Sequence, residues 1–240
     1  LGSIFRLYGN YEKAINFHLE ALELYEGVKN NEGIAWSALN IARLFRMLKN
    51  YLKAFEYINQ SLEIYQRIAF EQENNTGVTL CLKEIGDIYY EKGDLGKAID
   101  YSEQVLQINK QSKNWQGYAN SLSSIGKIYF QSAEFQLSDK YLTEALSIKD
   151  SLNDNTEKAS ILRHLGLIEL KSGNLAQSEK NLKKGLDFAI KQNLKEEVKE
   201  SYLALSEYFE KTNNNSSALN YYKLYINLKY SINSQKINEI

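Results

Sequence analysis

The chain has 240 residues, of which 43% are hydrophobic and 25% charged, a balance that lets a globular chain bury a core. Its formal net charge of −1 excludes a global attraction to nucleic acid or to an anionic membrane surface. No apolar run approaches the roughly 18 residues needed to span a bilayer, and the single cysteine, Cys81, excludes an internal disulfide.

Small residues recur at regular intervals along the whole chain. One set opens the second of two expected helices in each copy, at spacings of 40 or 44 residues: Ala14, Ala54, Ala98, Ser138, Ser178 and Ala218. Another set lies twelve residues earlier in each copy: Gly2, Ala42, Gly86, Gly126, Gly166 and Ser206. Two small positions at constant separation predict paired helices whose backbones approach closely.

Other columns repeat with the same period. In the first helix, a bulky residue follows the small one by three positions: Phe5, Phe45, Tyr89, Tyr129, Glu169 and Phe209. In the second helix, one aliphatic position recurs: Leu22, Leu62, Leu106, Leu146, Leu186 and Ile226. Within each helix the apolar residues fall at i, i+3 and i+4, which predicts one buried face per helix. The absence of proline fits uninterrupted helices.

The turns between paired helices carry their own signals. Gly93-Asp94 and Gly173-Asn174 combine a left-handed glycine with an Asp or Asn N-cap. Ala133-Glu134 has neither residue, so we expect that turn to be the least well capped. Asn215 stands where the other copies place an apolar residue, which predicts a loosened loop over residues 213–217.

These columns resemble the tetratricopeptide repeat (TPR), whose pattern is W-x2-L-G-x2-Y followed by A-x3-F and then A and P. Ile85-Gly86, Tyr89 and Ala98 match it, Ser102 stands where F is usual, and the proline is missing throughout. The period of about 40 exceeds the usual 34 residues. It resembles the long-repeat subclass of bacterial peptide-responsive regulators, sensor kinases and eukaryotic GoLoco-binding scaffolds.

The resemblance implies an all-α fold, a right-handed α-solenoid of six TPR-like helix-turn-helix repeats. We expect a single superhelical domain over residues 1–240, with repeats at about 1–32, 34–73, 77–116, 117–155, 157–195 and 197–236. The first copy lacks the start of its first helix, so we expect a fragment of a longer protein. The residues after Tyr225 are expected to continue as a helix, either a cap or a linker toward an output domain.

We predict that the chain is not an enzyme and carries no metal or cofactor. His18 and His164 lie in different copies without a Cys or second His at ligand spacing. Cys81 has no neighbouring His and is interpreted as a small buried thiol. Gly96-Lys97 lacks the remaining residues of a phosphate-binding loop.

The first helices of such repeats line the concave side of the superhelix. On each first helix, the face next to the core-packed positions is expected to line a partner-binding groove. The candidate groove residues are Asn40, Arg43, Lys83, Asp87, Tyr90, Lys127, Phe130, Arg163, His164 and Lys171. Beside the aromatic Phe130 stand four basic or imidazole side chains: Lys127, Arg163, His164 and Lys171. This mixture favours an acidic or C-terminal peptide with one apolar anchor. The alternative is an ordinary solvated helix face with scattered charge.

We therefore predict a protein- or peptide-binding TPR module, the sensor or regulatory domain of a bacterial signalling protein. The alternative is a structural adaptor that holds a multiprotein assembly. The ligand is expected to be a protein or peptide in the groove, with no nucleic acid and no direct membrane contact. A soluble domain in the cytoplasm or the periplasm is expected.

Overall fold

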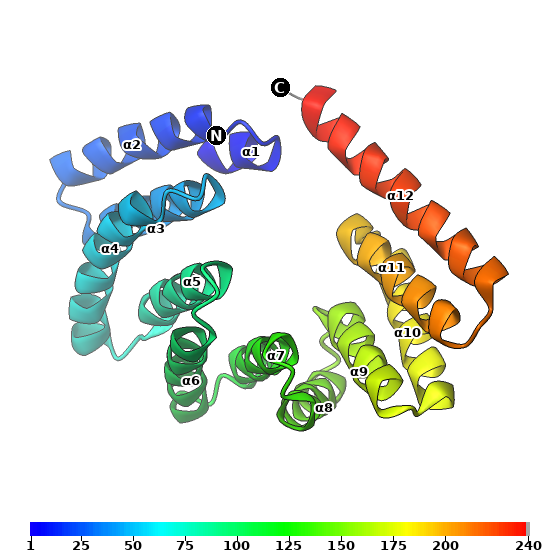
Figure 1. Cartoon of the computed structure of the whole chain (residues 1–240). Helices are drawn as coiled ribbons and strands as arrows, with labels where there is room; N and C mark the ends of the chain where they lie inside the picture. Colours follow the sequence, from blue (N-terminus) through cyan, green and yellow to red (C-terminus); the bar gives the residue numbers. More distant parts are fainter. Residues whose placement is uncertain (239–240) are drawn as a thin grey trace. The chain divides into compact units, whose positions relative to one another are not determined.

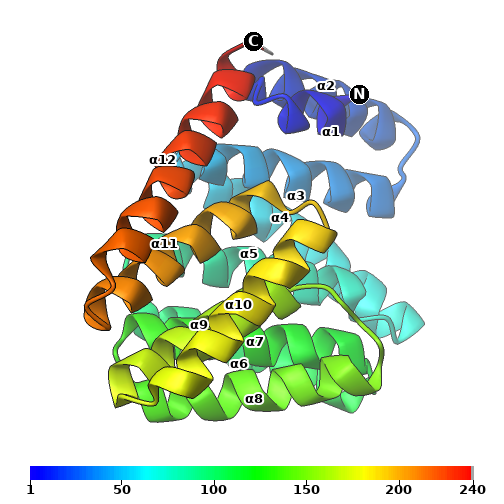
Figure 2. The same ribbon diagram turned by 90° about the vertical axis from the view of Figure 1, so that its right-hand side faces the viewer.

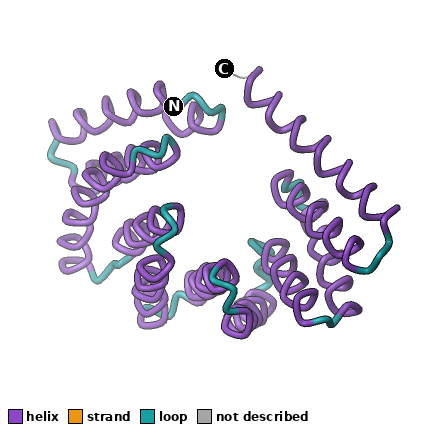
Figure 3. The backbone as a smooth tube through the Cα atoms, in the orientation of Figure 1, coloured by secondary structure: helices purple, strands orange, loops and turns teal. Residues whose placement is uncertain are grey.

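The computed structural model describes residues 1–238, and every regular element in that range is an α-helix (Figures 1 and 3). The first six helices are α1 (Gly2–Leu7), α2 (Tyr11–Gly27), α3 (Asn31–Met47), α4 (Tyr51–Gln72), α5 (Thr76–Glu91) and α6 (Leu95–Gln111). The other six are α7 (Trp115–Gln131), α8 (Phe135–Ser151), α9 (Lys158–Ser172), α10 (Leu175–Lys191), α11 (Lys195–Lys211) and α12 (Asn215–Asn238).

The helices pair in succession and antiparallel, α1 with α2, α3 with α4, and so on to α11 with α12. The predicted all-α class and its helix-turn-helix repeats are thus confirmed. The chain divides into two compact units, unit 1 over residues 1–113 with α1 to α6, and unit 2 over Asn114–Asn238 with α7 to α12. That all six repeats form a single domain stays a prediction.

The two columns of small residues lie where paired helices touch. The Ser138 hydroxyl donates to the carbonyl of Gly126 at 2.7 Å, and Ser178 repeats the bond to Gly166 at 2.8 Å. An added Cβ on Gly126 or on Gly166 would lie 2.7 Å from a leucine Cγ of the partner helix. The predicted close approach of the helices is therefore confirmed.

The bulky column of the first helix stacks on an aromatic residue of the second helix, twelve residues later. Five repeats show this pair at centroid distances of 5.2 to 5.8 Å: Phe5–Phe17, Phe45–Tyr57, Tyr89–Tyr101, Tyr129–Tyr141 and Phe209–Tyr221. In the fifth repeat Glu169 replaces the ring and accepts a hydrogen bond from Asn174 at 2.6 Å.

The turns depart from two predictions. The loop predicted over residues 213–217 is wrong, because α12 begins at Asn215 and the Asn214 side chain accepts the Ser217 N–H as a regular N-cap. Asn174 does not cap α10, since its side chain is bound to Glu169 instead. Glu134 makes no capping hydrogen bond, but since Asn174 makes none either, the turn at Glu134 is not singled out as the least well capped.

Candidate functional site

In unit 1 the predicted partner-binding residues lie on α3 and α5, which contact each other. Arg43 Nε lies 2.8 Å from Glu84 Oε1, and Arg46 Nε lies 3.0 Å from the other oxygen of the same carboxylate. Arg46 also forms an ion pair with Glu91. Glu84, with its side chain only 6% exposed, is therefore neutralised from two sides.

The other candidates in unit 1 differ in accessibility. Asn40 is buried, and its amide donates to the Trp36 carbonyl at 2.8 Å, one turn earlier on α3. Lys83 and Asp87 form an exposed ion pair at 2.9 Å, and Tyr90 is 36% exposed. Among these residues, Arg43 is a cation held in place by an ion pair with Glu84. The Asn40 amide is already bonded to the backbone of its own helix, α3.

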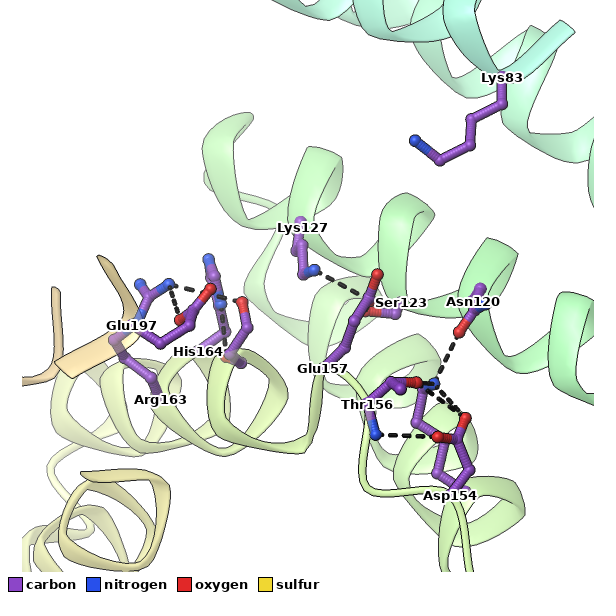
Figure 4. A network of polar contacts seen from close by, with 12 residues as sticks. Lys83, Asn120, Ser123, Lys127, Asp154, Thr156, Glu157, Arg163, His164 and Glu197 are labelled. Carbon is purple, nitrogen blue, oxygen red and sulfur yellow. Dashed lines mark hydrogen bonds and ion pairs between the residues drawn. The ribbon is translucent and has the colours of Figure 1, made fainter. Parts of the chain in front are cut away.

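In unit 2 Lys127 points from α7 toward Glu157 at the start of α9 (Figure 4). Lys127 Nζ lies 3.1 Å from Glu157 Oε2, which also accepts the Ser123 hydroxyl at 2.8 Å. Burial opposes ionisation of Glu157, but the charge of Lys127 and these hydrogen bonds hold the pKa of Glu157 below its ordinary value.

Arg163 and His164 stand side by side on α9 and make different contacts (Figure 4). Arg163 Nη2 lies 3.2 Å from Glu197 Oε2 on α11, while its Nε is buried without a hydrogen-bond partner among residues 1–238. The His164 ring meets Phe130 of α7 edge to face, with centroids 5.1 Å apart and planes at 87°. The structure thus brings Phe130 of α7 and His164 of α9 together, with Arg163 next to His164 on α9.

His164 is a neutral ring at physiological pH. Burial, and then the charge of Arg163, lower its pKa to about 3. Its Nδ1 lies 2.8 Å from the Ser160 carbonyl, so Nδ1 carries the hydrogen and Nε2 is an acceptor. His164 therefore extends the apolar surface of Phe130 and adds no positive charge to the face.

Lys171 is exposed near the other end of α9, and among the described residues it has no ion-pair partner within 4.0 Å. Burial raises the pKa of Glu207 on α11 above its ordinary value, although the charge of Lys171 opposes the rise. Lys171 is thus the most available cation of the candidate residues in unit 2.

A buried ionic cluster holds the connection from α8 to α9. Lys149 is fully buried, and its Nζ lies 2.9 Å from Asp154 Oδ2, 2.6 Å from Asn120 Oδ1 and 3.1 Å from Thr156 Oγ1. Figure 4 labels these three partners, Asp154, Asn120 and Thr156. This cluster ties residues 154–156 to α7 just before α9 begins. It therefore fixes where α9 presents its side chains beside α7.

The acidic partners were missed by the sequence analysis. Glu84, Glu157 and Glu197 each follow their basic partner by 30 to 41 residues, about one repeat. The sequence signal that could have indicated these pairs is a basic residue on one first helix followed, about one repeat later, by an acidic residue at or near the next first helix.

Two further observations bear on chemistry. Among residues 1–238 no group of three His, Cys, Asp or Glu side chains could hold a metal ion, and no helix is long and apolar enough to cross a membrane. Cys81 is buried 3.3 Å from the Ser61 hydroxyl, and burial raises the pKa of its thiol. The clustered side chains can hold charge and accept or donate hydrogen bonds, which is the chemistry of binding.

The family model of the tetratricopeptide repeat matches residues 1–67 and 78–151, together more than half of the chain. The chain belongs to the tetratricopeptide repeat family. The resemblance inferred from the repeated columns is thereby confirmed. No curated protein matches this TPR sequence.

Solved structures share the TPR fold at low identity. BtubC (BKLC) from P. vanneervenii is similar with a TM-score of 0.74 and 17% identity, covering 93% of this chain and 92% of that one. A Rap protein complexed with Competence and Sporulation Factor has a TM-score of 0.71 and 17% identity, covering 98% and 74%. Aspartyl phosphate phosphatase F from Bacillus subtilis has a TM-score of 0.72 and 14% identity, covering 95% and 68%.

Proposed function

We propose that this TPR chain is a regulatory module of a bacterial signalling protein that binds a peptide on the face of α7 and α9 in unit 2. The observation that carries the proposal is the edge-to-face pair of Phe130 and His164, flanked by Lys127 and Arg163. An apolar surface with a cation on each side matches a peptide that has one apolar anchor and a carboxylate.

The cations keep donors for a ligand. Lys127 has three N–H donors, and within the described residues it forms one ion pair, with Glu157. Arg163 has five donors, and its contacts to Glu197 and Ser160 both use Nη2. Lys127 is already held in place by Glu157, and Arg163 by Glu197. Each cation therefore loses less side-chain entropy when a peptide carboxylate binds. Lys171 adds an exposed charge farther along α9.

The anchor would be an aliphatic or aromatic side chain. Burying one such side chain against Phe130 and the neutral His164 ring contributes about 1.5–3 kcal/mol. A protonated imidazole would weaken this contact, and the low pKa of His164 keeps the ring neutral.

The candidate residues of unit 1 are proposed as a separate contact region. Arg43 uses Nε for Glu84, which leaves its two Nη groups as donors beside the exposed ring of Trp36, 5.9 Å from the guanidinium carbon. Lys83, Asp87 and Tyr90 on α5 would complete this region.

A peptide ligand is also supported by the Rap structure, which holds Competence and Sporulation Factor. None of the three compared structures is described as a sensor kinase, so we propose a regulatory peptide-binding module without assigning it to a kinase. We further propose that the module acts by binding alone, although one similar structure is described as a phosphatase. Hydrolysis of a phosphorylated aspartate by the purified chain would contradict this.

The test is selection of random peptides on the immobilised chain, followed by calorimetry of the enriched sequences. We expect peptides with a carboxylate and one apolar residue, and a Lys127→Glu/Arg163→Glu double variant should bind them at least about tenfold more weakly. The matched control is Lys180→Glu/Lys184→Glu on α10, which changes the net charge of unit 2 equally. Equal loss in both variants, or no loss in the first, would refute the proposed face.

A further inference from the structure

In unit 2 each second helix presents one face to the first helix that follows. On α10 this face carries Leu182, which is fully buried in one cluster with Ala204, Leu205 and Tyr208 of α11. The residue in register on α8, Leu142, is also fully buried. Leu182 also lies against Gly166 of α9, as Leu142 lies against Gly126 of α7, and the following helices α9 and α11 in turn pack on α8 and α10.

The corresponding face of α12 is open. Tyr222 stands forty residues after Leu182, yet 47% of it is exposed, and Leu219 and Tyr230 are 55% and 70% exposed. Ile226 lies between them at helical spacing and is partly exposed. Figures 1 and 2 show α12 lying against α11, which covers its other side. Large apolar side chains exposed along one helix face mark an interaction surface. We define the outer face of α12 as Leu219, Tyr222, Ile226, Lys229 and Tyr230.

The charge of α12 itself indicates what this face would accept. The second helix α10 is rich in lysine, and the helix that covers it, α11, carries five glutamates and three lysines. Tyr208 of α11 also donates to Glu179 of α10 at 3.2 Å. By its sequence α12 carries Lys223, Lys229 and Lys236 and no acidic residue. Two copies of α12 would bring six lysines together, so self-pairing is disfavoured and an acidic partner is favoured.

We propose that the outer face of α12 docks an acidic amphipathic helix of a partner protein, in the way that α11 docks on α10. The apolar side of that helix would pack on Tyr222 and Ile226, as Ala204, Leu205 and Tyr208 pack on Leu182. Its carboxylates would face Lys223 and Lys229. This surface is separate from the face of α7 and α9, and the proposal does not depend on peptide binding there.

The structure supplies its own probe, the 17-residue sequence of α11 (Lys195–Lys211) as an acetylated and amidated synthetic peptide. We expect saturable binding of this peptide to the full chain, measured by calorimetry, and weaker binding as salt rises. Tyr222→Ala should weaken it by about tenfold, because Tyr222 is the central apolar contact. Lys229→Gln should weaken the binding of the peptide by about threefold. The matched control, Asn220→Asp, changes the net charge by the same amount on another side of α12 and should leave the binding unchanged.

Two controls separate this surface from the others. The Lys127→Glu/Arg163→Glu variant should bind the α11 peptide as tightly as the unchanged chain does. Weaker binding by this variant would place the acidic peptide on α7 and α9 and would overturn the proposal. A control peptide with its five glutamates changed to lysine should not bind. No binding of the α11 peptide at millimolar concentration would overturn the proposal. Self-association of the chain that Tyr222→Ala abolishes would overturn it as well, because the occupant would then be a second copy.

Discussion

Replacing Asp154 by asparagine should destabilise unit 2, because it removes the carboxylate that forms an ion pair with the buried Lys149. Lys149 is fully buried, and Asp154 Oδ2 lies 2.9 Å from its Nζ. Removing one partner of a buried ion pair costs about 3–5 kcal/mol, since the other charge stays buried without compensation. Asn120 and Thr156 still accept hydrogen bonds from Lys149 in the variant. We therefore expect Asp154→Asn to lower the free energy of unfolding by about 3 kcal/mol, the low end of that range.

The same pair predicts a pH dependence. Burial alone would raise the pKa of Asp154, but hydrogen bonds from Lys149 and Thr156 and the lysine charge lower it to about 2, from an ordinary 3.8. Because the folded pKa lies below the unfolded one, the carboxylate stabilises the fold fully above pH 4. This stabilisation, about 2 kcal/mol, is lost as the pH falls from 4 to 2.

The measurement uses the two tryptophans, of which Trp36 lies in unit 1 and Trp115 in unit 2. In a Trp36→Phe background, the fluorescence of Trp115 reports urea unfolding of unit 2. The matched control is Asp187→Asn, which breaks the ion pair with Lys191 at 2.6 Å, where the two side chains are 56% and 68% exposed. It should cost less than about 0.5 kcal/mol. Equal costs in the two variants, or a cost of Asp154→Asn that is the same at pH 7 and pH 2.5, would refute the reasoning.

Four further outcomes follow from the burial, backbone conformation and packing of single residues. The Hε1 resonance of His164 should show no titration midpoint above pH 4, since its pKa is about 3, and a midpoint near 6.5 would show that the ring is hydrated. Ala133→Gly should raise the free energy of unfolding by about 1 kcal/mol, because Ala133 has a left-handed φ of +62°. A lower urea midpoint for this variant would contradict that reason. Gly166→Ala should cost about 1–3 kcal/mol, because its Cβ would lie 2.7 Å from Leu182 Cγ. Gly27→Ala, with nothing within 4 Å, should be neutral or stabilising in the same denaturation assay.

The helix pairs were predictable because their determinants are local or repeat with a fixed period. Gly126 and Ser138 stand twelve residues apart, and in the structure they are joined by a hydrogen bond at 2.7 Å. The loop prediction for residues 213–217 was wrong because it rested on the missing apolar residue at position 215. Asn214 alone is sufficient to start α12, and Asn215 is exposed, so no apolar side chain is required there.

That the candidate residues bind a partner stays a prediction, and the sequence did not indicate their electrostatics. Lys127 and Arg163 were predicted as partner-binding cations, and the structure shows that each lies against an acid from the next repeat. Which acid reaches which base depends on how the next repeat is rotated, and helical periodicity within one repeat carries no information about that rotation. Likewise, His164 has a low pKa because other helices bury it.

Locating a bound peptide by the two histidines tests the proposed face most directly. The chain contains only His18, in unit 1, and His164, in unit 2. Their Hε1 signals can be assigned with His18→Gln. A selected peptide titrated to saturation should shift the His164 signal and leave that of His18 in place. A peptide that binds by calorimetry but leaves the His164 signal unmoved would contradict the assignment of the binding face to α7 and α9.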